Sequence, residues 1–246
     1  MSIKAVVFDF DGVIVETEEA DYLAWREIWA RYGLELRLDE WTLCIGTRQS
    51  AATFSAFEDL RRLTGLPLRE AEIQGEQRAI TTRLLAGTQP LGGVLDWLDA
   101  AGAASLPAAI ASSSSRSWVT GHLRRVGLET RFSAIACFDD CGAAKPNPAP
   151  YLLACERLGV EPSEAMAIED SRNGLVAAKA AGLTCVVVPT LMTANMIFTE
   201  ADLVLGSLQD ATLSQVLDYF DQADGLATES CQAAEQPCGD DRAALA

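Results

Sequence analysis

The sequence predicts an α/β protein built on a doubly wound parallel sheet, with an all-helical domain inserted after the first strand. A short apolar run near the N-terminus, residues 5–8, ends directly in closely spaced acidic residues. From residue 94 onward, strand-like apolar runs alternate with helical segments, as expected of consecutive βα units. The stretch between them, residues 36–86, shows helical periodicity and no convincing strand.

The first strand is predicted over residues 5–8, because a short continuous apolar run is typical of a buried parallel strand. Asp9 and Asp11 follow it on the same side of the chain, and Gly12 permits a sharp turn. Two adjacent carboxylates repel each other, and a hard cation such as Mg²⁺ lets both stay ionised. One carboxylate is then able to attack an electrophile while the other transfers protons. An ordinary Asp-Gly turn after a strand is the alternative, and this stretch alone does not decide between them.

The helical insert is expected to begin with a helix capped by Thr17 and ended by Gly33. Aromatic side chains recur along this helix at helical spacing, and we interpret them as packing residues. Two more helices are expected over residues 50–63 and 70–85. A turn-rich linker, GTQPLGG, then returns the chain to the sheet, so the insert is assigned to residues 16–87.

The remaining chain is assigned to the sheet domain, which comprises residues 1–15 and 88–220. Its further strands are expected at 108–112, 134–138, 165–169, 184–188 and 202–205. Its helices are expected at 94–103, 117–126, 149–158, 174–181 and 208–220. Residues 221–246 are rich in Ala, Glu, Gln and Asp with little apolar content, which predicts a disordered tail.

Two stretches after predicted strands carry groups suited to anion binding. In IASSSS (110–115) an apolar strand ends in hydroxyl groups and opens a helix, so Ser112 and the amides after it are candidates for anion binding at the helix N-terminus. The alternative is an ordinary helix cap. In AKPNP (144–148), Lys145 lies in a loop stiffened by prolines and is suited to neutralising transition-state charge. The alternative is a solvated surface lysine.

A third stretch, IEDSRNG (168–174), places Glu169 and Asp170 at a strand end before a helix. These acids are able to supply the further oxygen ligands that Mg²⁺ requires, although Asp170 also suits a helix cap. Each stretch alone leaves both interpretations open. Because the carboxyl ends of parallel strands meet at one edge of a sheet, the four stretches together predict a single site.

Composition narrows the function classes. The chain has 246 residues, a formal net charge of −16 and only three lysines, which argues against nucleic acid as a partner. No apolar run is long enough to span a bilayer, and the N-terminus runs directly into a strand without a signal-peptide pattern. The seven cysteines have no zinc-site spacing. We expect a cytoplasmic monomer that binds neither nucleic acid nor membrane.

The four motifs FDFDGV (8–13), IASSSS (110–115), KPNPAPY (145–151) and IEDSRNG (168–174) resemble those of the haloacid dehalogenase superfamily of phosphohydrolases. The resemblance covers the chain from its start to about residue 220. It is closest to the subgroup that contains β-phosphoglucomutase and small sugar-phosphate phosphatases. The family resemblance implies a Rossmann-like core, a mobile helical cap formed by the insert, and Mg²⁺ as cofactor.

The resemblance also implies roles for individual residues. Asp9 would be the nucleophile that forms an aspartyl-phosphate, and Asp11 the general acid and then the base for water. Ser112, Ser113 and Lys145 would hold the transferring phosphoryl group.

Further roles concern the metal and the cap. The metal ligands implied are Asp9, Asp11 through its backbone carbonyl, Asp170 and, close by, Glu169. In the cap, Arg48 lies near a position where relatives carry a substrate-contacting arginine, or it is a surface residue at a helix start.

The expected function is therefore a Mg²⁺-dependent phosphohydrolase that acts on a small phosphorylated metabolite, a sugar phosphate by resemblance. A phosphomutase of the β-phosphoglucomutase type is the first alternative. Mutases of that type carry a histidine near the position of Asp21, and its absence here favours hydrolysis. A non-catalytic phosphoryl-acceptor or sugar-phosphate-binding module is the second. Receiver domains of that kind lack a cap insert and take their acceptor aspartate from a later strand.

Overall fold

The computed structural model describes residues 2–46 and 54–234, and it confirms the predicted fold class. Six parallel strands form one sheet in the order β3-β2-β1-β4-β5-β6. The strands are β1 Ala5–Phe8, β2 Ala108–Ala111, β3 Ala134–Ala136, β4 Ala165–Glu169, β5 Thr184–Val187 and β6 Leu203–Val204. β1 lies between β2 and β4, with Val7 aligned to both Ala109 and Ala167. The strand that carries the first acidic motif is therefore central to the sheet.

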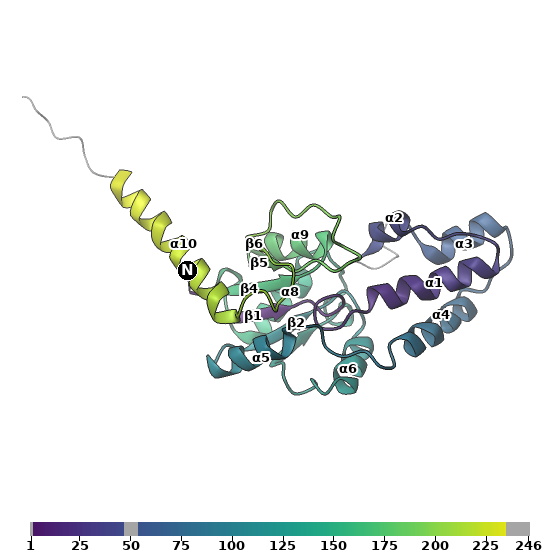
Figure 1. Ribbon diagram of the computed structural model, residues 1–246, viewed down its shortest axis with the longest axis horizontal. Coiled ribbons are helices and arrows are strands. Elements are labelled where there is room, and N and C mark those ends of the chain that lie inside the picture. Colours follow the sequence, from purple (N-terminus) through teal and green to yellow (C-terminus); the bar gives the residue numbers. More distant parts are fainter. Residues whose placement is uncertain (1, 47–53, 235–246) are drawn as a thin grey trace, which may run out of the picture.

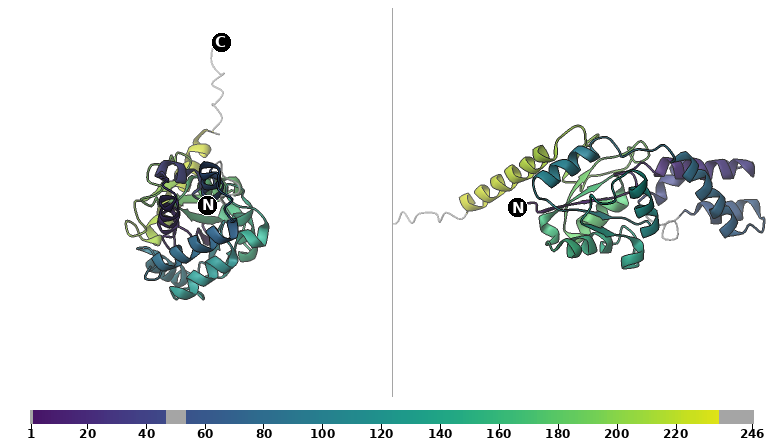
Figure 2. Two further views of the ribbon diagram at one scale, coloured as in Figure 1. Left: turned by 90° about the vertical axis from the view of Figure 1, so that its right-hand side faces the viewer. Right: turned by 90° about the horizontal axis from the view of Figure 1, so that it is seen from below.

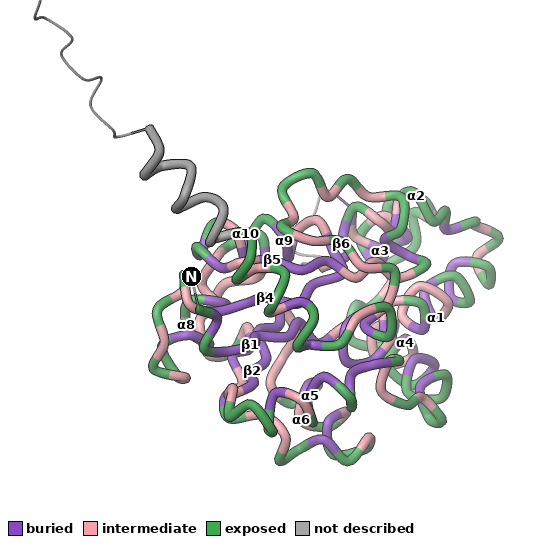
Figure 3. The backbone as a smooth tube through the Cα atoms, turned by 60° about the vertical axis from the view of Figure 1, so that its left-hand side comes forward, coloured by how far each residue is buried: buried purple, intermediate pink, exposed green. Residues whose placement is uncertain are grey.

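Helices cover both faces of the sheet (Figure 1). Alternate residues of β1 point to opposite faces, since Val6 and Phe8 belong to one buried cluster and Ala5 and Val7 to the other. The first cluster includes side chains of α5 Val94–Ala103, α6 Arg116–Arg125 and α10 Leu213–Ala234. The second includes side chains of α8 Ala149–Leu158 and α9 Arg172–Ala181. Alanines dominate the strands on this second face, and α8 contacts β1, β2 and β3 there. The central strands β1, β2 and β4 are buried along their whole length between the two layers, whereas the edge strand β6 is partly exposed (Figure 3).

The insert is helical, as predicted, and lies at the end of the molecule opposite α10 (Figures 1 and 2). Its elements are α1 Glu18–Arg31, α2 Leu38–Trp41, the 3-10 helix Thr42–Cys44, α3 Ala56–Thr64 and α4 Glu70–Leu84. Trp25, Trp29 and Trp41 are buried in its own apolar cluster, which confirms that they are packing residues. Met192 from the loop after β5 joins the same cluster, so the insert packs against the sheet domain. The division of the chain at residues 16 and 87 stays a prediction.

Several helix and strand ends differ from the prediction. The third strand stops at Ala136, and a short helix, α7 Phe138–Cys141, follows it. The last helix of the sheet domain begins at residue 213 and not at 208, because Thr212 and Gln215 form a reciprocal capping box.

The expected disordered tail is wrong over residues 221–234, where α10 continues. Ala, Leu, Gln and Glu in this stretch are good helix formers, and this propensity outweighs the low apolar content that suggested disorder. No helix within residues 2–46 and 54–234 combines the length and apolar character needed to cross a membrane.

Candidate active site

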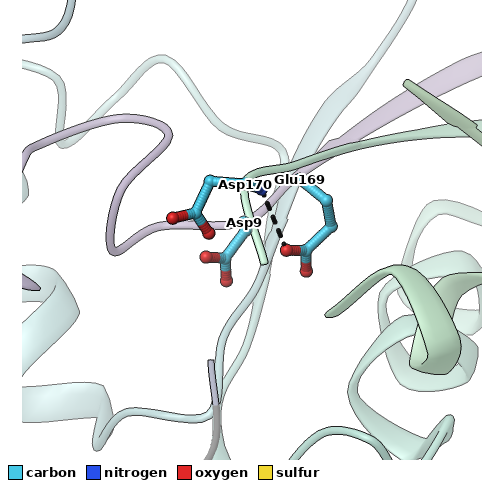
Figure 4. A group of neighbouring side chains, drawn as sticks. All are labelled: Asp9, Glu169 and Asp170. Atoms are coloured by element: carbon cyan, nitrogen blue, oxygen red, sulfur yellow. Dashed lines mark hydrogen bonds between the residues drawn. The ribbon is translucent and has the colours of Figure 1, made fainter. Parts of the chain in front are cut away.

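Three carboxyl groups meet at the carboxyl ends of β1 and β4 (Figure 4). Phe8 is aligned with Ile168, and the Asp9 amide donates to the Ile168 carbonyl at 2.9 Å, so the residues that follow the two strands are neighbours. Oxygen atoms of Asp9, Glu169 and Asp170 lie within 4.8 Å of one another, and all three residues are buried. The sheet register thus brings the first and fourth predicted motifs together.

Lys145 lies between two of these acids. Its Nζ forms an ion pair with Asp9 and another, at 2.6 Å, with Glu169 Oε1. Tyr151, from α8, donates its hydroxyl to the same Glu169 oxygen at 2.6 Å. The lysine is 1% exposed, so the predicted alternative of a solvated surface lysine is wrong. Burial opposes its charge, but the two carboxylates outweigh this and raise its pKa above the usual value.

The pKa values of Asp9 and Asp170 are raised by burial and by the charges of the neighbouring acids. Burial raises the pKa of Asp9 to about 8, with Lys145 opposing and the neighbouring acids adding to the rise. Burial and then the charges of Asp9 and Glu169 raise the pKa of Asp170 well above its usual value. The charge of one lysine therefore does not compensate the three acids, and a further positive charge would stabilise the cluster.

Asp170 is the residue that needs a further partner. Both of its carboxylate oxygens are buried and have no hydrogen bond from any residue that the structure describes. Such a group is costly unless a donor or cation compensates it. Gly12 lies against it with φ +87°, and a Cβ there would come within 2.4 Å of Asp170 Oδ2. Hard oxygen donors, burial and missing partners together fit a Mg²⁺ ion.

Asp11 is held by three donors at the rim of this cluster. Its Oδ1 accepts the Thr17 hydroxyl at 2.6 Å and the Trp118 indole N–H at 2.8 Å, and its Oδ2 accepts the Ser114 hydroxyl at 2.6 Å. Thr17 precedes α1, but its side chain makes no cap bond and serves Asp11 instead. Trp118 lies on α6, and its bond to Asp11 has no signal in the sequence because it depends on how α6 packs.

The serines that follow β2 make different hydrogen bonds. Ser112 is fully buried, and its Oγ accepts the Ser114 amide at 3.0 Å. Ser113 accepts the Lys145 amide at 3.1 Å and donates to the Gly46 carbonyl of the insert, also at 3.1 Å. Ser115 caps α6, as the alternative interpretation of this stretch suggested. Phosphate binding by Ser112 and Ser113 stays a prediction.

The insert closes over these groups and leaves a cavity of about 630 Å³. Asp9, Asp11 and Ser113 line its floor, and the insert supplies its walls. Asn173 adds to the contact by donating to the Ile45 carbonyl at 2.8 Å. Arg48, the predicted cap residue, lies outside the described residues.

The fold and this cluster define an α/β enzyme whose active site lies at the carboxyl edge of a parallel sheet, beneath a helical cap. The chain belongs to the haloacid dehalogenase-like hydrolases, since the family match covers residues 6–188. The resemblance noted in the sequence is therefore confirmed.

Similar proteins agree with this assignment. The Bacillus subtilis protein YhcW, described by name as a candidate phosphatase, is 40% identical over 89% of this chain and 98% of its own length. A phosphorylated carbohydrates phosphatase of Thermotoga maritima is 30% identical over 74% of this chain and 82% of its own. The crystal structure of CbbY from Rhodobacter sphaeroides in complex with xylulose-1,5-bisphosphate has a TM-score of 0.73 and 31% identity, and it covers 86% of this chain and 98% of that one. These relatives and the family confirm the prediction of an enzyme of the phosphatase class.

Proposed function

We propose that this protein is a Mg²⁺-dependent phosphatase that hydrolyses a small sugar phosphate through an aspartyl-phosphate on Asp9. The observation that supports it most strongly is the buried cluster in which Lys145 pairs with Asp9 while Asp170 has no hydrogen-bond partner among the described residues. Phosphoryl transfer needs positioned charge more than covalent chemistry, and this cluster offers positive charge beside a carboxylate. The relatives named for phosphorylated carbohydrates and for a sugar bisphosphate support the substrate class.

In the proposed first step, an Asp9 oxygen attacks phosphorus and the bond to the leaving oxygen breaks. Asp11 gives its proton to that oxygen, and Lys145 balances charge on the phosphoryl group. In the second step Asp11 takes a proton from the attacking water, Asp9 is released and phosphate leaves. Asp9, the Asp11 carbonyl and Asp170 would hold Mg²⁺, which supplies charge neutralisation when bound.

The three donors around Asp11 suit these two tasks. The hydroxyls of Thr17 and Ser114 rotate and are able both to donate and to accept, so they tolerate either protonation state. The Trp118 indole only donates, so it needs Asp11 Oδ1 as an acceptor in both steps and holds the carboxyl group in one orientation.

Replacing Trp118 with Phe is expected to lower kcat about tenfold with little change in KM, because the lost bond orients Asp11 while phenylalanine keeps an aromatic side chain on the cavity wall. Steady-state phosphate release measures both constants. Trp97→Phe is the matched control, since that indole bonds the Leu208 and Ala211 carbonyls in the core, at 2.9 and 3.0 Å. The control should lose stability and keep its kcat. Equal loss of kcat in both variants would argue against a specific role for Trp118.

Adding Mg²⁺ is expected to raise the melting temperature, because the ion would compensate Asp170 in the folded state only. At a hundredfold excess over its Kd the gain is about 2.7 kcal/mol, which corresponds to roughly 5–10 °C for a chain of this size. Asp170→Asn should abolish this shift without lowering the metal-free melting temperature, since it removes a buried carboxylate for which the described part of the chain offers no hydrogen-bond partner.

Asp99→Asn serves as the control for this measurement. Asp99 is an exposed partner of Arg131, and its loss should leave the Mg²⁺ shift intact. A Mg²⁺ shift in the Asp170→Asn protein as large as in the unmodified protein would contradict the metal assignment.

Phosphate release from a panel of phosphorylated metabolites, with Mg²⁺ and with a chelator, tests the function itself. Product analysis in the same assay separates hydrolysis from the mutase alternative, which would isomerise a sugar phosphate without net release. A phosphorylated Asp9 that persists without hydrolysis would instead favour the phosphoryl-acceptor module.

A further inference from the structure

Three side chains on one face of α6 form a chain of contacts that leads away from Asp11. Trp118, His122 and Arg125 follow one another at intervals of four and three residues, which places them on the same side of a helix. Trp118 is the end of this chain that contacts the proposed general acid, through the bond from its indole to Asp11 Oδ1. His122, which is the single histidine of the sequence, and Arg125 are therefore candidates for holding this indole in place.

The His122 ring packs directly against Trp118. The two ring centroids are 4.2 Å apart and the ring planes lie at 67°, which is an edge-to-face contact. Phe10, the residue before Asp11, lies with its ring centroid 6.3 Å from that of the same imidazole. The imidazole therefore restricts the rotation of the indole that bonds to Asp11.

Arg125 fixes the orientation of this imidazole. Its Nη2 lies 2.9 Å from His122 Nδ1. A guanidinium group only donates, so Nδ1 accepts and the ring proton lies on Nε2. This bond requires a neutral imidazole, and burial and then the charge of Arg125 lower the pKa of His122 below its usual value, with Asp11 opposing. The ring is therefore neutral near neutral pH and held in one tautomer.

Arg125 is itself anchored to the end of the insert. Its Nη1 donates to the carbonyl oxygen of Leu85 and, at 2.9 Å, to that of Thr88. Leu85 is the C-cap residue of α4, and Thr88 lies in the turn-rich segment between α4 and α5. Carbonyl groups at a helix C-terminus lack donors within the helix, so an arginine is a favourable partner for them. Arg125 thus binds this segment with one nitrogen and His122 with the other.

We infer that His122 and Arg125 are positioning residues for the proposed general acid. They hold the Trp118 indole in place, and the indole in turn orients the Asp11 carboxyl group. The inference rests on the proposed function, which assigns the proton transfers to Asp11. Arginine is suited to this task because its planar fork reaches the imidazole and the two carbonyl groups at once. The alternative is that Arg125 only caps α4 and contributes to stability alone.

Replacing Arg125 with Met tests the outer end of the chain of contacts. Arg125 is exposed, so methionine removes its hydrogen bonds without opening a cavity in the core. We expect kcat for phosphate release to fall about fivefold with KM unchanged, because the lost bonds act on the orientation of Asp11. Arg124→Met is the matched control, since this neighbouring arginine pairs with Glu129 at the surface, and it should keep its kcat. An Arg125→Met protein with the kcat of the unmodified protein would overturn the inference.

The same substitution in a Trp118→Phe protein separates positioning from stability. If Arg125 acts through the indole, Arg125→Met should not lower kcat further once the indole is absent, whereas independent effects would multiply. The melting temperature should fall by a similar amount in both backgrounds. A further loss of about fivefold in the double variant would overturn the assignment of the effect to Trp118.

Two replacements of His122 each remove one of its contacts. His122→Phe keeps an aromatic ring against Trp118 and loses the acceptor for Arg125, and His122→Asn keeps an acceptor and loses the ring. Both should lower kcat about fivefold, because the chain of contacts needs the ring and the acceptor together. Full kcat in either protein would overturn the inference, since the contact that this protein lacks would then be dispensable.

Hydrogen exchange at the Trp118 indole keeps this inference distinct from the proposed chemistry. The sequence has five tryptophans, and the NMR signal of this indole N–H is identified by its absence from the Trp118→Phe protein. Its exchange with solvent should be at least about tenfold faster in the Arg125→Met protein and unchanged in the Arg124→Met protein. Faster exchange without hydrolysis of any ester by the unmodified protein would defeat the proposed phosphatase and support the role of Arg125 in holding the indole. Unchanged exchange with normal hydrolysis would overturn this inference alone.

Discussion

Replacing Asp9 with Asn is expected to lower kcat for phosphate release by roughly 10⁴-fold or more, whichever phosphate ester is used. The amide has nearly the same shape but is a poor nucleophile, so no phosphoryl-enzyme forms. Asp9 is also one of the three clustered acids and the partner of Lys145, and no other carboxylate of the cluster follows β1. Initial rates of phosphate release at saturating substrate and Mg²⁺ measure the effect.

Two further variants test whether the loss of activity is specific to Asp9. Asp202→Asn changes a half-exposed carboxylate that pairs with Lys179 and does not belong to the acidic cluster, and it should retain full activity. Asp11→Asn should lose about 10²–10⁴ in rate because it removes proton transfer, but Asp9 should still take up a phosphoryl group that mass spectrometry detects. Full activity in the Asp9→Asn protein would end the proposed mechanism.

Much of the sheet domain could be predicted from local sequence. The helices at 94–103 and 149–158 and the strand at 165–169 have the predicted bounds, because each is a continuous periodic or apolar segment between turn formers. Prediction failed where a side chain bonds to a residue outside its own helix or strand. Thr17 is of a residue type that commonly caps helices, yet its hydroxyl donates to Asp11. This hydrogen bond depends on tertiary structure.

The residues of the site also divide into those that could be predicted from the sequence and those whose contacts depend on tertiary packing. The positions of Asp9, Glu169 and Asp170 could be predicted because strand order and register place strand ends together. The contacts of Tyr151 and Trp118 could not, since they depend on the packing of helices on opposite faces of the sheet.

In the cap, sequence spacing did not reveal the bonds of Asp21 with Gln77 and Thr81, which join α1 to α4. Spacing along one helix indicates which residues share its face. It carries no information on which residue of another helix they will meet.

Replacing Lys145 with Met is expected to lower the free energy of unfolding by about 3–5 kcal/mol in the absence of metal, because the change leaves Asp9 and Glu169 as neighbouring buried acids without their cation. Methionine fills most of the lysine volume, so loss of packing contributes little. Chemical denaturation with a chelator present measures the loss. Activity should fall as well, since the lysine is proposed to balance charge on the phosphoryl group.

Lys179→Met is the matched control for Lys145→Met. The chain has only three lysines, and Lys179 pairs with the carboxylate of Asp202 at a half-exposed site. Its loss should cost less than about 1 kcal/mol. Mg²⁺ should recover part of the stability of the Lys145→Met protein, since an ion bound by Asp9 and Asp170 would replace some of the missing positive charge. Equal destabilisation by the two lysine variants, or a Lys145→Met protein as stable as the unmodified one, would show that the ion pairs of Lys145 do not hold the site together.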